Sequence, residues 1–265
     1  MHTLRFQLDQ GDRNVGTIHL PDDLSKPLPV LVVCIPGPGN AEPTAFTQSL
    51  RRRGTAAGMA VVTFDLHGWG DTGGDPNEGS YGRWAANLAD VCTYISSHQW
   101  ADAHRVGALG VSAGSTAVLR CAIETRKLAF GISVATYIGH FTLPVGPAKM
   151  LVDNLDTLAS GYKIEVKGSS GATIYHVGLD YFLDAIGGAP VYRLHELTCP
   201  IFFLQGGADN AFRRSDARLG YDLLRSDGLP AKYLEIERGD HVLANVAAEA
   251  TTAVLEWLRE VEFLR

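Results

Sequence analysis

Three residues of the chain have the types that a serine nucleophile, its base and an orienting acid require. Ser112 lies in Gly110-Val-Ser-Ala-Gly114, which matches the pattern Gly-x-Ser-x-Gly. A serine hydroxyl is a weak nucleophile unless a base accepts its proton and an acid orients that base. Asp209 and His241 follow Ser112 in the chain order Ser, acid, His. We therefore predict acyl transfer by Ser112, with His241 as base and Asp209 as the orienting acid.

The residues around Ser112 suit a strained turn between a strand and a helix. An apolar run over residues 106–111 leads into the motif, and a helical pattern over residues 113–126 follows it. Such a turn exposes the serine Oγ at the edge of a sheet, and the backbone N–H of Ala113 then serves as an oxyanion donor. The alternative interpretation is a glycine-rich turn in which Ser112 only caps the helix.

The predicted acid and base each follow a predicted strand near the end of the chain. Asp209 comes after the apolar run 201–204, and His241 comes after the alternating run 232–236. The carboxyl ends of parallel strands meet at one edge of a sheet, so we expect both side chains there. The alternative interpretations are a turn or N-cap residue for Asp209 and a residue at the start of a helix for His241.

Three other aspartates are weaker candidates for the acid, because none directly follows a buried core strand. They are Asp180, Asp184 and Asp240. The eight histidines other than His241 form no pair at metal-ligand spacing, so no metal is predicted.

The second oxyanion donor is expected from the loop after the first buried strand, Pro36-Gly-Pro-Gly-Asn40. Pro36 and Pro38 have no backbone N–H and cannot donate. We select Gly39 among the residues that remain. The alternative is that this loop is only a tight turn.

Strand and helix patterns alternate along most of the chain. Leu4, Phe6 and Leu8, then Val15, Thr17 and His19, predict an N-terminal antiparallel hairpin. The further predicted strands are residues 29–35, 60–64, 106–111, 128–135, 201–204 and 232–236, and the predicted helices are residues 45–57, 81–97, 113–126, 212–227 and 242–262. This alternation predicts an α/β fold, with a mainly parallel sheet covered by helices on both faces.

A long segment, residues 137–196, separates two of the predicted core strands. We predict that it is a lid or cap inserted within a single domain, residues 1–265, and that it contains a β-hairpin around Gly168-Ser-Ser-Gly171. The alternative is a structural insertion packed on an edge. Trp69, Phe141 and Tyr181 are our candidates for substrate-binding residues, although aromatic residues of the insertion could equally pack the lid itself.

Composition and charge narrow the range of functions. The 265 residues carry a net charge of −6, which argues against a nucleic-acid partner or a membrane surface as partner. Four widely spaced cysteines without a Cys-x-x-Cys pair predict buried free thiols. Free thiols, together with an N-terminus that shows no basic and apolar leader pattern, favour a cytoplasmic location. No glycine pattern typical of a dinucleotide or nucleotide site is present, so we expect no cofactor.

The motifs together resemble the α/β-hydrolase superfamily over nearly the whole chain. The resemblance rests on Gly110-Val-Ser-Ala-Gly114, on Gly-Gly-Ala-Asp209 and on Gly-Asp-His241. Asp65-Leu-His-Gly-Trp-Gly-Asp-Thr-Gly is also similar to that family's Asp-x-Arg-Gly-x-Gly-x-Ser-x-Gly loop, with His67 in the Arg place. The position and length of the insertion are similar to those of small carboxylesterases of the cinnamoyl (feruloyl) esterase type.

This resemblance implies a serine carboxylesterase that acts on a small-molecule ester with a small or aromatic acyl group. One departure concerns the family's His-Gly-x oxyanion loop, because Pro36-Gly37 replaces His-Gly and Pro38 stands at the donor position. A thioesterase, amidase or acyltransferase could use the same three residues. A non-catalytic binding module of the same fold is a further alternative, and the sequence leaves a homo-oligomer open.

Overall fold

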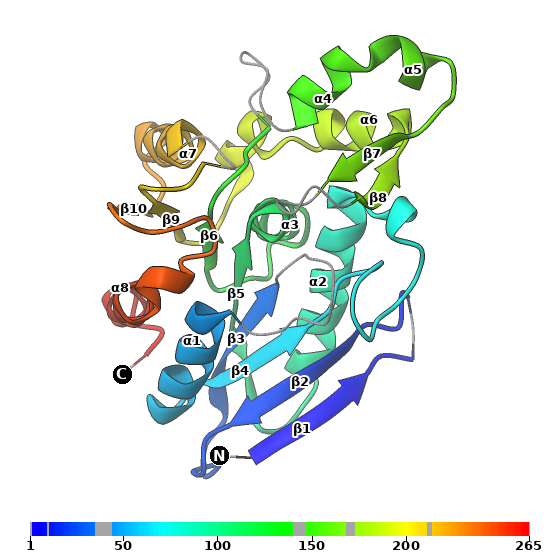
Figure 1. The fold of residues 1–265 in the computed structure, drawn as a ribbon. Helices are drawn as coiled ribbons and strands as arrows, with labels where there is room; N and C mark the ends of the chain where they lie inside the picture. The colour runs from blue at the N-terminus through cyan, green and yellow to red at the C-terminus, as the bar shows by residue number, and fades with distance from the viewer. Residues whose placement is uncertain are drawn as a thin grey trace.

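Figure 1 shows the computed structural model of the chain, which describes residues 2–9, 11–34, 44–139, 147–167, 173–210 and 214–264. The strands are β1 (His2–Gln7), β2 (Val15–Leu20), β3 (Leu28–Cys34), β4 (Ala60–Phe64), β5 (Ala101–Val111), β6 (Gly131–Val134), β7 (Ile164–Lys167), β8 (Thr173–Val177), β9 (Ile201–Gly206) and β10 (Ala231–Ile236). The α-helices are α1 (Ala45–Ala56), α2 (Tyr81–Ser96), α3 (Ala113–Thr125), α4 (Pro147–Asp153), α5 (Leu155–Ala159), α6 (Leu179–Gly187), α7 (Arg214–Ser226) and α8 (Ala247–Glu260). Short 3₁₀ turns are η1 (Pro76–Glu78), η2 (Pro190–Tyr192), η3 (Leu194–Glu196) and η4 (Ala244–Val246).

Eight of these strands form one sheet in the order β1-β2-β4-β3-β5-β6-β9-β10. β1 pairs antiparallel with β2, and β2 pairs antiparallel with β4. From β4 to β10 every neighbouring pair is parallel. The predicted mainly parallel sheet is therefore confirmed. All its parallel strands have their carboxyl ends at one edge.

The apolar strands are buried because helices cover both faces of the sheet. Val30, Val32 and Cys34 of β3 pack in the cluster that holds the apolar side chains of α2 and α3. Leu31 and Val33 point to the other face and pack with α1 and α8. Successive side chains of a strand point to opposite faces, so a strand buried on both faces is apolar throughout. Figure 1 shows α1 and α8 on one side of the sheet and α2 on the other.

Several element boundaries differ from the predicted ones, and three of the differences have a clear local reason. β5 begins at Ala101 rather than at residue 106, because residues 102–105 are at least partly exposed and carry no large apolar side chain that would reveal the strand. β6 ends at Val134, since Ala135 has a φ of +50° that an extended strand does not allow. α8 begins at Ala247 rather than at residue 242, because a tight turn occupies the residues before it.

The segment between β6 and β9 holds α4, α5, the hairpin β7–β8, α6 and the turns η2 and η3. β7 and β8 pair antiparallel, with Ile164 opposite Val177, so the predicted hairpin is present. Figure 1 shows α4 to α6 and the hairpin beyond the ends toward which β3 and β5 point. Residues 168–172 lie outside the described residues. Whether this insertion acts as a lid remains a prediction.

Candidate active site

The turn between β5 and α3 holds Ser112 in a strained backbone conformation. Its φ is +57° and its ψ is −126°, outside the regions that residues other than glycine usually adopt. A Cβ at Gly110 would clash with the backbone of Gly114, so the turn requires glycine at position 110. The Ser112 N–H donates to Val134 O at 2.9 Å and ties the turn to β6. The Ser112 side chain makes no capping hydrogen bond to α3, which leaves its Oγ free of that role.

Asp209 and His241 are joined by a hydrogen bond. His241 Nδ1 lies 2.9 Å from Asp209 Oδ2, and the Asp209 side chain is 0% exposed against 26% for His241. An ionised carboxylate only accepts hydrogen bonds, so the proton of this bond belongs to Nδ1. The other ring nitrogen, Nε2, is then the one able to accept a proton.

Backbone contacts hold the loops after β9 and β10 against each other. Ala208 N–H donates to Gly239 O at 2.9 Å, and Gly207 N–H donates to Ile236 O at 2.8 Å. A Cβ at Gly206 would overlap the carbonyl groups of Gly239 and Asp240, so only glycine allows this approach. The loop that carries Asp209 is thereby fixed to the loop that carries His241.

Asp240 shapes the turn that carries His241. Its Oδ1 accepts from the N–H groups of Val242 at 3.1 Å and Ala244 at 2.8 Å. Asn245 closes the same turn, because its Nδ2 donates to Arg238 O at 2.7 Å. Asp240, a weaker candidate for the acid, is therefore engaged with the backbone beside the histidine.

Asp184, another weaker candidate for the acid, binds partners on two helices of the core. Its carboxylate accepts from Arg120 Nη1 at 3.0 Å and from the Gly82 N–H at 3.0 Å. The Arg120 side chain is itself nearly buried on α3. Asp184 thus joins α6 of the insertion to α2 and α3.

Of the two predicted oxyanion donors, the structure describes one. Ala113 is the first residue of α3 and directly follows Ser112, so its N–H lies at the amino end of that helix. Gly39 lies outside the described residues, as does the rest of its loop. The amino end of a helix favours negative charge, which suits a developing oxyanion beside Ser112.

Two of the three predicted substrate-binding residues are buried between the core and the insertion. Trp69 is 7% exposed, and its ring meets the Tyr175 ring of β8 edge-on, with centroids 5.5 Å apart. Tyr181 is also nearly buried, and its hydroxyl lies 3.2 Å from the Tyr81 hydroxyl of α2. Both rings connect the insertion to the core, and their contact with substrate remains a prediction. Phe141 lies outside the described residues.

The loop after β4 is held by hydrogen bonds within the loop and by contacts from α2 and from the turn between β1 and β2. Asp65 Oδ2 accepts from the Asp71 N–H at 2.8 Å, and the Trp84 indole donates to His67 O at 3.2 Å. The buried His67 ring lies 3.3 Å from Asp12 Oδ1. Gly74 packs against that ring so closely that a Cβ would overlap it. These contacts place Trp69 between the core and the hairpin.

Sequence reasoning did not single out Gln205, which contacts the candidate acid directly. Its Nε2 donates to Asp209 Oδ2 at 3.0 Å from the end of β9. The only signal in the sequence is a polar amide that directly follows the apolar run 201–204. A single polar residue forms no spacing pattern, so the sequence alone assigns no function to it.

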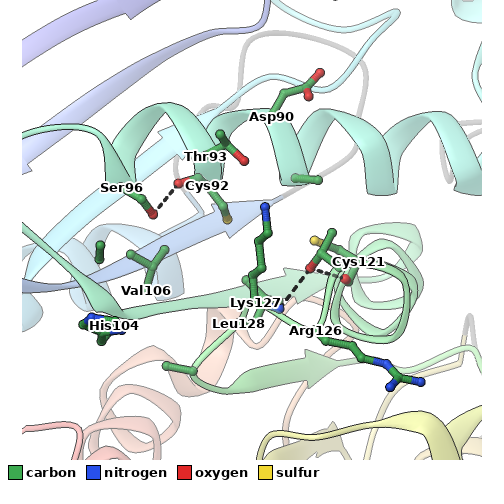
Figure 2. Close-up of a pocket in the computed structure, with 14 residues that line it drawn as sticks. Asp90, Cys92, Thr93, Ser96, His104, Val106, Cys121, Arg126, Lys127 and Leu128 are labelled. Atoms are coloured by element: carbon green, nitrogen blue, oxygen red, sulfur yellow. Dashed lines mark hydrogen bonds between the residues drawn. The ribbon is translucent and has the colours of Figure 1, made fainter.

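A separate cavity of about 600 Å³ lies between α2, α3 and the amino ends of β5 and β6. Figure 2 shows Cys92 and Cys121 among its lining residues. Burial raises the pKa of the Cys121 thiol to about 12 and holds the pKa of Cys92 well above its usual value. Thiols in this state are poor nucleophiles at neutral pH. Ala103 and His104 near the amino end of β5 line this cavity, whereas Ser112 follows the carboxyl end of the same strand.

The residues that the structure describes contain neither a candidate metal site nor a candidate membrane-spanning helix. Within them, no three His, Cys, Asp or Glu side chains gather in a way that could hold a metal ion. No helix in these described ranges has both the length and the apolar character needed to cross a bilayer. All four cysteines are buried free thiols.

Solved structures of similar shape cover almost the whole chain. Est1E from Butyrivibrio proteoclasticus matches with a TM-score of 0.72 and 15% identity, over 98% of each chain. A second structure of Est1E, with ferulic acid bound, gives a TM-score of 0.73 and 16% identity over 94% of this chain and 95% of that one. Mouse alpha/beta hydrolase domain-containing protein 10 gives a TM-score of 0.75 and 14% identity, over 97% of this chain and 99% of that one. At these identities the likeness shows a shared fold.

Sequence comparison finds shorter matches, and no family model matches the chain. The uncharacterized protein YcjY of Escherichia coli (strain K12) is 29% identical over 120 residues, which are 44% of this chain and 38% of that protein. Esterase FrsA of Serratia proteamaculans (strain 568) is 26% identical over 132 residues, which are 47% of this chain and 29% of that protein. The matched stretch is thus less than half of this chain and of either relative.

Proposed function

We propose that this chain, which has the α/β-hydrolase fold, is a serine hydrolase that cleaves carboxylic esters. The observation that carries the proposal is the 2.9 Å hydrogen bond between His241 Nδ1 and Asp209 Oδ2. It lies at the same edge of the sheet as the strained turn of Ser112, because all three residues follow the carboxyl ends of parallel strands. A nucleophile on such a turn, with a base oriented by an acid, is the arrangement that acyl transfer requires.

In the proposed reaction Ser112 Oγ attacks the acyl carbonyl while His241 Nε2 accepts the hydroxyl proton. The ester C–O bond then breaks, and His241 returns the proton to the leaving alcohol. Water then attacks the acyl-enzyme while His241 Nε2 accepts a proton from it. The bond to Ser112 Oγ breaks, and His241 returns the proton to Ser112 as the acid leaves. Asp209 keeps the Nδ1 proton in place and stabilises the imidazolium, and the Ala113 N–H stabilises the oxyanion.

The proposed substrate is an ester with a small or aromatic acyl group. Ferulic acid, an aromatic acid, is bound in one of the structures of similar fold. In this chain, aromatic side chains gather where the insertion meets the core, with Trp69 against Tyr175 and Tyr181 against Tyr81. Rates on esters, thioesters and amides of one acyl group would separate an esterase from a thioesterase or amidase.

The test is the loss of ester hydrolysis on removal of the Ser112 hydroxyl. With p-nitrophenyl acetate and butyrate, Ser112→Ala should lower kcat by at least ~1000-fold, because the nucleophile is gone. A fluorophosphonate should label the native chain and leave Ser112→Ala unlabelled. Ser97→Ala is the control, since Ser97 is exposed at the far end of α2. Equal rates for the native chain and Ser112→Ala would overturn the proposal.

A further inference from the structure

Gln205 is a buried amide at the carboxyl end of β9, next to the candidate acid. Its side chain is 0% exposed, and its neighbours along the strand, Phe203 and Leu204, are fully buried as well. An amide buried among apolar side chains destabilises the fold unless it forms hydrogen bonds. The sheet itself gains nothing from this amide that an apolar residue would not supply.

Both donor positions of the Gln205 amide are used, and its acceptor is not. Nε2 donates to Asp209 Oδ2 at 3.0 Å and to Gly206 O at 3.2 Å. Oε1 has no hydrogen-bond partner among the residues that the structure describes. The opposite amide orientation would place Oε1 against the Asp209 carboxylate, where two acceptors repel each other. The amide is therefore oriented by the carboxylate, although one of its own polar atoms is left without a partner.

Gln205 and His241 donate to the same oxygen of Asp209. Oδ2 accepts from Gln205 Nε2 at 3.0 Å and from His241 Nδ1 at 2.9 Å. Two donors from different elements, β9 and the loop after β10, leave this carboxylate little freedom to rotate. Hydrogen bonds to a charged acceptor are shorter and stronger than those between neutral groups, so they fix its orientation effectively.

We propose that Gln205 is a positioning residue of the reaction site, which holds the Asp209 carboxylate in the rotation that orients the His241 ring. The inference rests on the proposed function, because it assigns Gln205 a role through Asp209 and His241. Gln205 does not touch the reacting atoms. Its removal therefore acts on proton transfer at His241, which affects kcat, rather than on substrate affinity, which affects KM.

The test replaces Gln205 by residues of similar length. Gln205→Leu and Gln205→Met remove the donor, and each should lower kcat by roughly 10-fold to 100-fold with KM within about twofold of the native value. Gln205→Glu restores a donor only while the new carboxyl group is protonated. Its kcat relative to the native chain should rise as the pH falls, whereas the ratio for Gln205→Leu should be the same at every pH. A merely structural role would not produce this difference between the two variants.

Thr251→Val is the matched control. Thr251 is fully buried, and its hydroxyl bonds to Ser49 Oγ and Ala247 O on α1 and α8, far along the chain from the Asp209 loop. It should lower the unfolding midpoint without changing kcat per folded molecule. Urea unfolding of every variant supplies the folded fraction by which kcat is divided.

A spectroscopic signal tests the inference without any substrate. The proton shared by His241 Nδ1 and Asp209 should give a downfield proton resonance that broadens in Gln205→Leu and Gln205→Met and stays sharp in Thr251→Val. If kcat and this resonance are unchanged in Gln205→Leu and Gln205→Met, the inference is overturned, and the proposed function stands. If the native chain hydrolyses no ester while the resonance still depends on Gln205, the proposed function falls and the positioning of Asp209 does not.

Discussion

At the scale of single residues, Gly110 allows β5 to turn directly into α3. A Cβ at this position would overlap the backbone of Gly114, which cannot move without displacing the helix. We expect Gly110→Ala to destabilise the fold by about 3 kcal/mol and to abolish hydrolysis, because the turn that presents Ser112 is lost. Gly187→Ala is the control, since Gly187 ends α6 in open space, and it should change stability by less than ~1 kcal/mol. Chemical unfolding measures the stability of both variants, and an unchanged stability in Gly110→Ala would contradict the expectation.

The sequence indicates some residues of the site and hides others, for physical reasons. Ser112 is visible because a glycine pattern and an apolar run must both be present for a strand to turn there. Asp209 and His241 are visible because each follows a strand at the same edge, and the structure joins them by a hydrogen bond. Gln205 is hidden, since its proposed role depends on a contact with Asp209 that only the turn after β9 creates.

At the scale of elements, the ion pair of Arg120 and Asp184 ties the insertion to the core. Arg120 Nη1 lies 3.0 Å from Asp184 Oδ1, and the Arg120 side chain is nearly buried. Removal of the Asp184 carboxylate leaves the nearly buried Arg120 charge with only the more exposed Glu124, whose Oε1 lies 3.3 Å from Arg120 Nε. Asp184→Ala should therefore lower the free energy of unfolding by about 2 kcal/mol. The double variant Arg120→Met/Asp184→Leu should be more stable than Asp184→Ala, because neither charge then remains buried. Hydrogen exchange should become faster in α6 of Asp184→Ala.

Asp222→Ala is the matched control for that pair. Arg218 Nε lies 3.0 Å from Asp222 Oδ1 on α7, but both side chains are exposed. Exposed ion pairs contribute little, so this variant should change stability by less than ~1 kcal/mol. Equal losses in Asp184→Ala and Asp222→Ala would show that burial does not strengthen the contact between α6 and α3.

The elements themselves differ in how clearly the sequence predicts them. β3 is apparent because both its faces are buried, which makes the whole run apolar. The start of α8 is not apparent from the sequence, because the pattern of apolar residues continues through the turn that Asp240 stabilises. The first residues of β5 are hard to predict for a related reason, since the four that follow Ala101 are at least partly exposed and lack an apolar pattern. Tertiary contacts, rather than local preference, set these boundaries.

At the scale of the whole molecule, Asp12 joins the antiparallel end of the sheet to the parallel part. It lies between β1 and β2, and Arg83 of α2 donates to both its oxygens at 2.9 and 2.7 Å. Asn87 of the same helix donates to Oδ2 at 2.8 Å, and the His67 ring lies 3.3 Å from Oδ1. The hydrogen bonds from Arg83 in particular lower the pKa of Asp12 from 3.8 to about 2. Folding and the ionisation of Asp12 are therefore linked.

The sign of this linkage predicts how acid destabilises the fold. A carboxyl group whose pKa is lower in the folded state stabilises the fold above its unfolded pKa and loses this contribution as the pH falls through the folded value. Asp12→Asn should therefore lower the free energy of unfolding by about 1 kcal/mol at neutral pH, and the difference from the native chain should shrink between pH ~4 and ~2. Urea unfolding at several pH values measures it, with the exposed Asp9→Asn as control. A difference that stays constant down to pH ~2 would mean that packing of Asp12, rather than its charge, holds the N-terminal hairpin to α2.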